Sequence, residues 1–233
     1  MSWRIKRSRP PRRILNTGRW SVGEVAALYL RHATINASEH PSAQRLPLVF
    51  VDERARVHIH DSVLDGAYSV RGLVVEHGAF VELHATIIFF CAATKGNGGG
   101  LLVNNSGVSL SMSAITNNGA ANDGGAIHLT GEGSLLHVRG SVFEYNVVRS
   151  NGAAIFVGGG VSVDVLDSYF ATNAAHGVRC ARGASAPRPA NTLKTVNFVC
   201  VGRASFAGRW RNIRGHVQRC PYFWQHDNDA QRW

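Results

Sequence analysis

The sequence repeats with a period of about 27 residues, and this repeat limits the folds open to the chain. Serine or threonine anchors recur with separations of 24, 27, 28 and 27 residues, at Ser62, Thr86, Ser113, Ser141 and Ser168. In all five units the residues five and three positions before the anchor, and two after it, are apolar. The positions between them are mostly polar or small, which is the alternation of a half-buried β-strand. A repeat of this length predicts a stack of similar coils.

Asparagine recurs five residues after the last three anchors, at Asn118, Asn146 and Asn173. Buried amides are tolerated where they are hydrogen-bonded, so we expect these side chains to form a stacked structural ladder. Cys91 occupies the same column and is predicted to be a buried apolar thiol. Each unit then reaches a turn of small residues and a short aliphatic strand, as in Gly124-Gly125-Ala126-Ile127.

These patterns predict an all-β fold, a single-stranded parallel β-helix (solenoid) of about five to seven coils. One coil cannot bury its inward side chains alone, whereas stacked coils bury them continuously. The three expected regions are a basic segment with a helical cap at residues 1–45, the β-helix at 46–205 with clear repeats at 57–177, and a basic, aromatic cap or tail at 206–233. Leucine-rich repeats have a similar period but need a leucine and asparagine consensus that is absent here, and propeller blades need about 40 residues each.

Ser21-Val22-Gly23-Glu24 is typical of a helix-capping box, and it precedes an apolar run at residues 25–30. We therefore expect a short helix that covers the first coil. The alternative makes Thr34 an earlier anchor, but Arg31 and Asn36 would then occupy apolar columns. Residues 46–51 are expected to form the first strand of the β-helix.

The segments Gly124 to Asn146 and Gly152 to Asn173 resemble the paired GGA[ILV] and FxxN repeats of right-handed β-helices in the pectin-lyase-like superfamily. They are especially similar to passenger repeats of chlamydial polymorphic outer-membrane (autotransporter) proteins. The resemblance covers about residues 57–177. It implies right-handed coils and a surface or adhesion role, outside the cell or on its surface.

The net charge of +10 is unevenly distributed along the chain. Residues 1–56 carry 11 basic and 4 acidic side chains, residues 57–177 carry 4 and 9, and residues 178–233 carry 10 and 2. The basic flanks suggest an alternative function, binding to nucleic acid or to another anionic surface. The first residues are basic, but Pro10 and Pro11 follow in place of the apolar run of a signal peptide. No apolar run is long enough for a transmembrane helix.

Two outward-facing columns form the candidate glycan or partner face. Its residues are His58, His60, Glu82, His84, Ser109, His137 and Asp164. Glycoside hydrolysis needs two carboxylates about 5–9.5 Å apart. No adjacent coils place two acids in one column, so we expect no catalytic residues, no metal site and no cofactor.

The leading hypothesis is a non-catalytic β-helix module with a surface, adhesion or structural role, binding a cell-surface polysaccharide or protein. The loop acids Asp123 and Glu132 keep open a second hypothesis, a divergent polysaccharide lyase or glycoside hydrolase. Cys180, Cys200 and Cys220 fit a disulfide in an oxidising compartment and free thiols in a reducing one. His176 and His216 each precede one of these cysteines by four residues, which gives a weaker zinc alternative.

Overall fold

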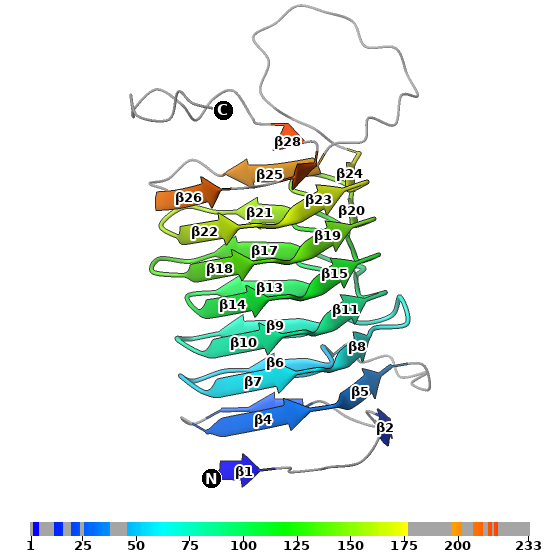
Figure 1. Cartoon of the computed structure of the whole chain (residues 1–233), viewed down its shortest axis with the longest axis vertical. Helices are drawn as coiled ribbons and strands as arrows, with labels where there is room; N and C mark the ends of the chain where they lie inside the picture. The colour runs from blue at the N-terminus through cyan, green and yellow to red at the C-terminus, as the bar shows by residue number, and fades with distance from the viewer. Residues whose placement is uncertain are drawn as a thin grey trace, which may run out of the picture.

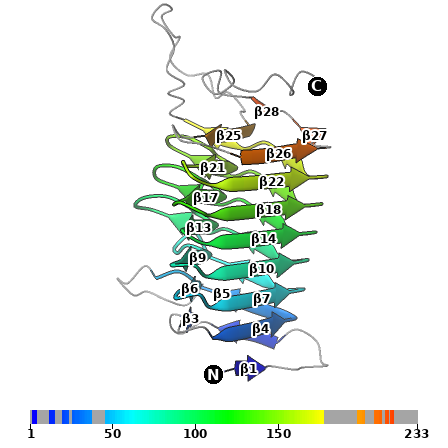
Figure 2. The same ribbon diagram turned by 90° about the vertical axis from the view of Figure 1, so that its left-hand side faces the viewer.

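The chain folds into a parallel β-solenoid of about five turns. The computed structural model describes residues 2–4, 12–15, 20–23, 26–37, 46–176, 197–201, 207–211, 214–215 and 217–218. These residues contain strands, turns and bends and no helix. Figures 1 and 2 show the strands stacked along one axis. The predicted all-β parallel solenoid is therefore confirmed.

Four parallel sheets run along the stack, three with eight strands and one with four. We name them A to D. Sheet A consists of β1 (Ser2–Arg4), β4 (Ala27–Arg31), β7 (Arg56–His60), β10 (Phe80–His84), β14 (Gly107–Ser111), β18 (Leu135–Arg139), β22 (Ser162–Leu166) and β26 (Ala207–Arg211).

Sheet B follows sheet A in each coil after a short corner. It consists of β2 (Arg12–Leu15), β5 (Ala33–Asn36), β8 (Val63–Asp65), β11 (Ile87–Phe89), β15 (Ala114–Thr116), β19 (Val142–Glu144), β23 (Tyr169–Ala171) and β27 (Arg214–Gly215).

Sheet D is the short sheet, with β12 (Ala92–Ala93), β16 (Gly119–Ala120), β20 (Val147–Val148) and β24 (Ala174–Ala175). Sheet C completes the coil. It consists of β3 (Trp20–Val22), β6 (Val49–Val51), β9 (Leu73–Glu76), β13 (Leu101–Asn104), β17 (Ile127–Thr130), β21 (Ile155–Val157), β25 (Asn197–Val201) and β28 (Val217–Gln218).

The coils wind in a right-handed sense, as the family resemblance implied. In Figure 1 the chain rises from its N-terminus at the bottom. The sheet A strands point right, the sheet C strands point left, and Figure 2 places sheet A on the near side of Figure 1. A chain that rises in this way turns counter-clockwise when viewed from its upper end, which is a right-handed helix.

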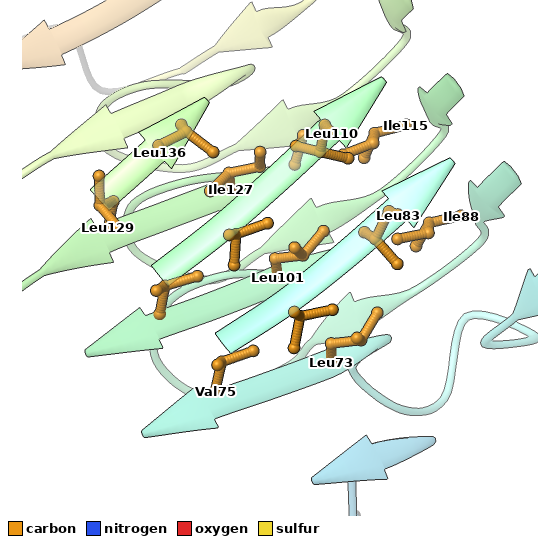
Figure 3. Packing of buried hydrophobic residues seen from close by; sticks show 14 of the residues in the cluster. Leu73, Val75, Leu83, Ile88, Leu101, Leu110, Ile115, Ile127, Leu129 and Leu136 are labelled. Atoms are coloured by element: carbon orange, nitrogen blue, oxygen red, sulfur yellow. The ribbon is translucent and has the colours of Figure 1, made fainter. Parts of the chain in front are cut away.

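The apolar columns predicted from the repeat form the core. All fifteen side chains at these positions are buried. Parallel pairing keeps each column in register from coil to coil, as for Val81 opposite Val57 and Val108. Figure 3 shows Leu83 and Ile88 of one coil beneath Leu110 and Ile115 of the next. The core is therefore one continuous apolar column along the stack.

The three asparagines form the predicted ladder. Each is almost fully buried. Oδ1 of Asn146 accepts hydrogen bonds from the backbone N–H and from Nδ2 of Asn118, both at 3.1 Å. Nδ2 of Asn146 donates to Ile115 O at 2.9 Å and to Asn173 Oδ1 at 2.9 Å. The ladder ends on the backbone N–H of Cys91, which donates to Asn118 Oδ1 at 2.9 Å.

The anchor hydroxyls form a second ladder at the corner between sheets A and B. Oγ of Ser141 accepts the backbone N–H of Ser113 at 3.2 Å and donates to Arg139 O at 3.0 Å. Ser168 makes the equivalent bonds to Ser141 and Leu166. The residue before each anchor has a positive φ of 46° to 55°. The hydroxyl thus bonds backbone groups that the sharp corner leaves outside the sheets.

The glycine-rich turns before the sheet C strands bring the backbones of neighbouring coils unusually close. A Cβ atom on Gly125 would lie 2.4 Å from Ala153 O, and one on Gly99 would lie 2.2 Å from Gly119 O. No real Cβ atom tolerates such contacts, so glycine is required at both positions.

The predicted N-terminal helix is wrong where the structure describes it, because residues 27–31 form β4 and residues 33–36 form β5. The true anchor position in this coil is Ala33, whose N–H donates to Ser62 Oγ at 3.1 Å. Counted from Ala33, the apolar columns contain Leu28, Leu30 and Ile35, all buried. The spacing from Ala33 to Ser62 is 29 residues, one more than the spacing from Thr34 to Ser62 that the alternative in the sequence analysis assumed. Alanine also lacks the hydroxyl of the other anchors.

Other sequence predictions fall partly outside the described residues. The strand expected at residues 46–51 is present as β6. Towards the end of the β-helix expected at residues 46–205, residues 197–201 form β25, which pairs with β21 in sheet C. Cys91 is buried as predicted, and burial raises the pKa of its thiol. Of the other cysteines, Cys180 and Cys220 lie outside the described residues.

Replacement of Asn146 by alanine is expected to lower the free energy of unfolding by about 3–5 kcal/mol. The variant loses the side-chain bonds of Asn146, leaves the buried N–H of Asn118 without its acceptor and opens a small cavity. Urea unfolding followed by circular dichroism measures the change. Asn104→Ala, at the half-buried end of β13, is the matched control, and equal losses in both variants would contradict the ladder's role.

Candidate functional site

The seven residues of the candidate face all lie on the outward side of sheet A. Strand alternation sends the apolar residues of β7, β10, β14, β18 and β22 inward and the residues between them outward. One outward column, which we call column 1, contains Tyr29, His58, Glu82, Ser109, His137 and Asp164 in successive coils. Column 2 contains Arg31, His60, His84, Ser111, Arg139 and Leu166. The sequence therefore identified one continuous face.

A stacked and hydrogen-bonded group occupies the start of column 1. His58 Nδ1 lies 2.7 Å from Glu82 Oε2. The other side of the His58 ring stacks on Tyr29, with ring centroids 4.7 Å apart and planes within 3°. Neighbouring strands of a sheet are separated by about 4.8 Å, so ring stacking fits the coil spacing. Tyr29 lies in a coil that the repeat did not identify, so its place in this face was missed.

In column 2, His60 and His84 are neighbours. Their ring centroids are 5.3 Å apart and their planes are tilted by 42°. His84 Nδ1 is hydrogen-bonded to Ser111 Oγ at 2.9 Å. Burial lowers the pKa of His60, and the positive charges of Arg31 and His84 lower it further. The neutral imidazole of His60 is thereby favoured, and neutral imidazoles donate and accept hydrogen bonds.

The carboxylates of the face are far apart. Glu82 and Asp164 share column 1 and are separated by three coils, about 14 Å at ordinary strand spacing. The described residues contain no group of three or more His, Cys, Asp or Glu side chains placed to hold a metal ion. The described face can therefore donate and accept hydrogen bonds but lacks a pair of acids spaced for hydrolysis.

The loop acid Asp123 belongs to a third ladder, which the sequence analysis missed. Its backbone N–H donates to Asn97 Oδ1 at 3.1 Å. Its own Oδ1 accepts from the backbone N–H of Asn151 at 2.8 Å and from Asn151 Nδ2 at 3.0 Å. The three residues each lie four positions before a sheet C strand, and that spacing was the available signal. The carboxylate of Asp123 is thus engaged in holding the turns of sheet C.

A second histidine–carboxylate pair lies at the turns that lead from sheet C into sheet A. His77 Nδ1 and Asp52 Oδ1 are 2.6 Å apart. The hydrogen bond and the negative charge of Asp52 raise the pKa of His77. Asp52 also accepts the backbone N–H of Glu53 at 2.9 Å. This pair joins two successive turns and lies outside columns 1 and 2.

His128 is the most deeply buried histidine of the described chain. It lies on β17, stacks on Phe156 with centroids 4.8 Å apart, and is only 5% exposed. Its Nδ1 atom has no hydrogen-bond partner among the described residues. Burial lowers its pKa to about 4. A buried, uncharged histidine in this position acts as an aromatic packing residue of the turn that contains Gly124.

Comparison of the chain with protein-family models, curated proteins and solved structures gave no match. Among the described residues, no helix has the length and apolar character needed to cross a membrane.

Acid is expected to destabilise the protein through His128. Its folded-state pKa of about 4 lies below the ordinary value of 6.5, so the unfolded chain binds a proton that the folded chain excludes. The free energy of unfolding should therefore be unaffected by this group above pH 6.5 and fall between pH 6.5 and 4, by about 3 kcal/mol in total.

The variant His128→Phe keeps an aromatic ring beside Phe156 and should remove this part of the acid dependence. Urea unfolding at a series of pH values between 7 and 4 is the measurement. His137→Phe, which changes an exposed histidine of column 1, is the control and should keep the acid dependence due to His128. The interpretation fails if His128→Phe and the unmodified protein lose stability in parallel.

Proposed function

We propose that the protein is a non-catalytic β-helix module that binds an extended glycan along the outward face of sheet A and serves in adhesion or surface structure. The main support for this proposal is the pair of outward columns, which place hydrogen-bonding side chains at every coil from β7 to β18. The spacing of about 4.8 Å between coils gives a straight, regular row of polar groups. A linear polymer with regularly repeated hydroxyls matches such a row.

The chemistry of the face supports recognition of neutral hydroxyl groups. The Glu82 carboxylate accepts hydrogen bonds, and the Ser109 hydroxyl both donates and accepts them. His58 and His137 present ring nitrogens. The His58–Glu82 contact holds both side chains in place before a ligand arrives, which reduces the entropy lost on binding. The stacked Tyr29–His58 rings add apolar surface at the N-terminal end of the column.

The wide separation of Glu82 and Asp164 supports binding without cleavage. The bonding of Asp123 in the third ladder weakens the alternative of a polysaccharide lyase or glycoside hydrolase with loop-borne acids. The proposed relationship to the pectin-lyase-like superfamily and to chlamydial passenger repeats adds a cell-surface location to this proposal. Its support is the GGA and FxxN pattern, which here corresponds to buried turns, Phe143 and Asn146.

Glycan-array binding of the full chain tests the proposal. We expect selective binding of extended polysaccharides and about tenfold weaker affinity after Glu82→Ala, because the variant removes an acceptor and frees His58. Glu132→Ala, in the exposed turn before β18, is the matched control and should bind normally. Cleavage of pectin, alginate or chitin by the purified protein would establish the enzyme alternative, and binding that survives Glu82→Ala unchanged would move the site away from this face.

A further inference from the structure

Exposed large apolar side chains are concentrated on one lateral surface of the solenoid. Sheet B presents an outward row of Val63, Ile87, Ala114, Val142 and Tyr169, one from each of five coils. Ile87 is 44% exposed and Tyr169 is 41% exposed. The corners that border sheet B add Tyr68, Met112 and Tyr145, each more than half exposed. We call sheet B with these corners the sheet B face.

The charges of the five central coils of the sheet B face have one sign. Its five coil segments, residues 61–67, 85–91, 112–118, 140–146 and 167–173, contain no lysine, arginine or histidine. They contain four carboxylates, those of Asp61, Asp65, Glu144 and Asp167. The face is therefore apolar and acidic in a protein whose net charge is +10.

The complementary charge lies at the two ends of the same chain. Residues 1–56 have a net charge of 11 − 4 = +7 and residues 178–233 have 10 − 2 = +8, whereas residues 57–177 have 4 − 9 = −5. The backbone carries these ends to opposite ends of sheet B, where the strand order begins with β2 and finishes with β27. Both outer strands contain arginine, at Arg12, Arg13 and Arg214.

We propose that the sheet B face binds a second copy of this chain, with the two stacks antiparallel and displaced along their axes. Direct superposition of two acidic centres would bring like charges together and is unfavourable. Displacement lets an arginine-containing outer strand of sheet B in each copy, β2 or β27, lie over the acidic, apolar centre of the other. A two-fold axis that lies in the plane of the interface, perpendicular to the stack axes, relates the copies and closes the assembly as a dimer. The interface is separate from columns 1 and 2, so glycan binding and dimerisation are independent.

Sedimentation of the full chain over a range of protein and salt concentrations tests the dimer. We expect reversible dimers that dissociate more readily as salt rises, because the attraction between basic ends and acidic centre is screened. Glu144→Lys should weaken dimerisation about tenfold or more, and Ile87→Ser should weaken it without changing the charge. Glu132→Lys makes the same charge change outside the face and should leave dimerisation intact.

Several results would overturn the proposal. A chain that stays monomeric at all concentrations has no such interface, and equal weakening by Glu132→Lys and Glu144→Lys would indicate a general charge effect. A monomer that binds a synthetic peptide of alternating arginine and leucine, and loses it in Glu144→Lys, would assign the face to a different, basic protein. Circular dichroism of each variant checks that the fold is retained.

Discussion

Hydrogen bonds from buried side chains to the backbone of the neighbouring coil determine how this solenoid is built. A slip of one residue between parallel strands would turn the apolar residues outward, but a slip of two residues keeps them inward, so the apolar columns alone leave the register incompletely fixed. The buried amides fix the register, because Asn146 must be hydrogen-bonded to both Asn118 and Asn173 or buried polar groups are left without partners. The anchor hydroxyls impose the same condition at the corner between sheets A and B. Register is thus fixed at separate points around each coil.

The sequence predicted what repeats and missed what varies. The fifteen core positions and the asparagine ladder recur at nearly constant spacing, so comparison of the units reveals them. The first coil was missed because Ala33 has no hydroxyl and its spacing is one residue longer. The ladder through Asn97, Asp123 and Asn151 mixes residue types and follows links of variable length. Tyr29 was not predicted as part of the candidate face, because only the structure identifies its coil.

Strand alternation separates the fold from the surface chemistry. In sheet A the inward residues build the core while the outward ones carry histidine, carboxylate and hydroxyl groups. In sheet B the outward residues are apolar and acidic, and in sheet C the turns cover His128 and Phe156. Each lateral surface can therefore change independently of the others, since substitutions there leave the inward columns unchanged.

The FxxN and GGA motifs predict the architecture rather than the ligand, because their residues face inward or lie in buried turns. Phe143 stacks on Phe170 inside the core, with parallel rings 4.7 Å apart, and Asn146 is fully buried in its ladder. Gly125 is required by the close approach of Ala153. These residues are used entirely in joining one coil to the next, so they cannot touch a ligand in the folded protein. The proposed binding would instead use the outward columns, whose residues differ from coil to coil because they lie outside the core and the buried ladders.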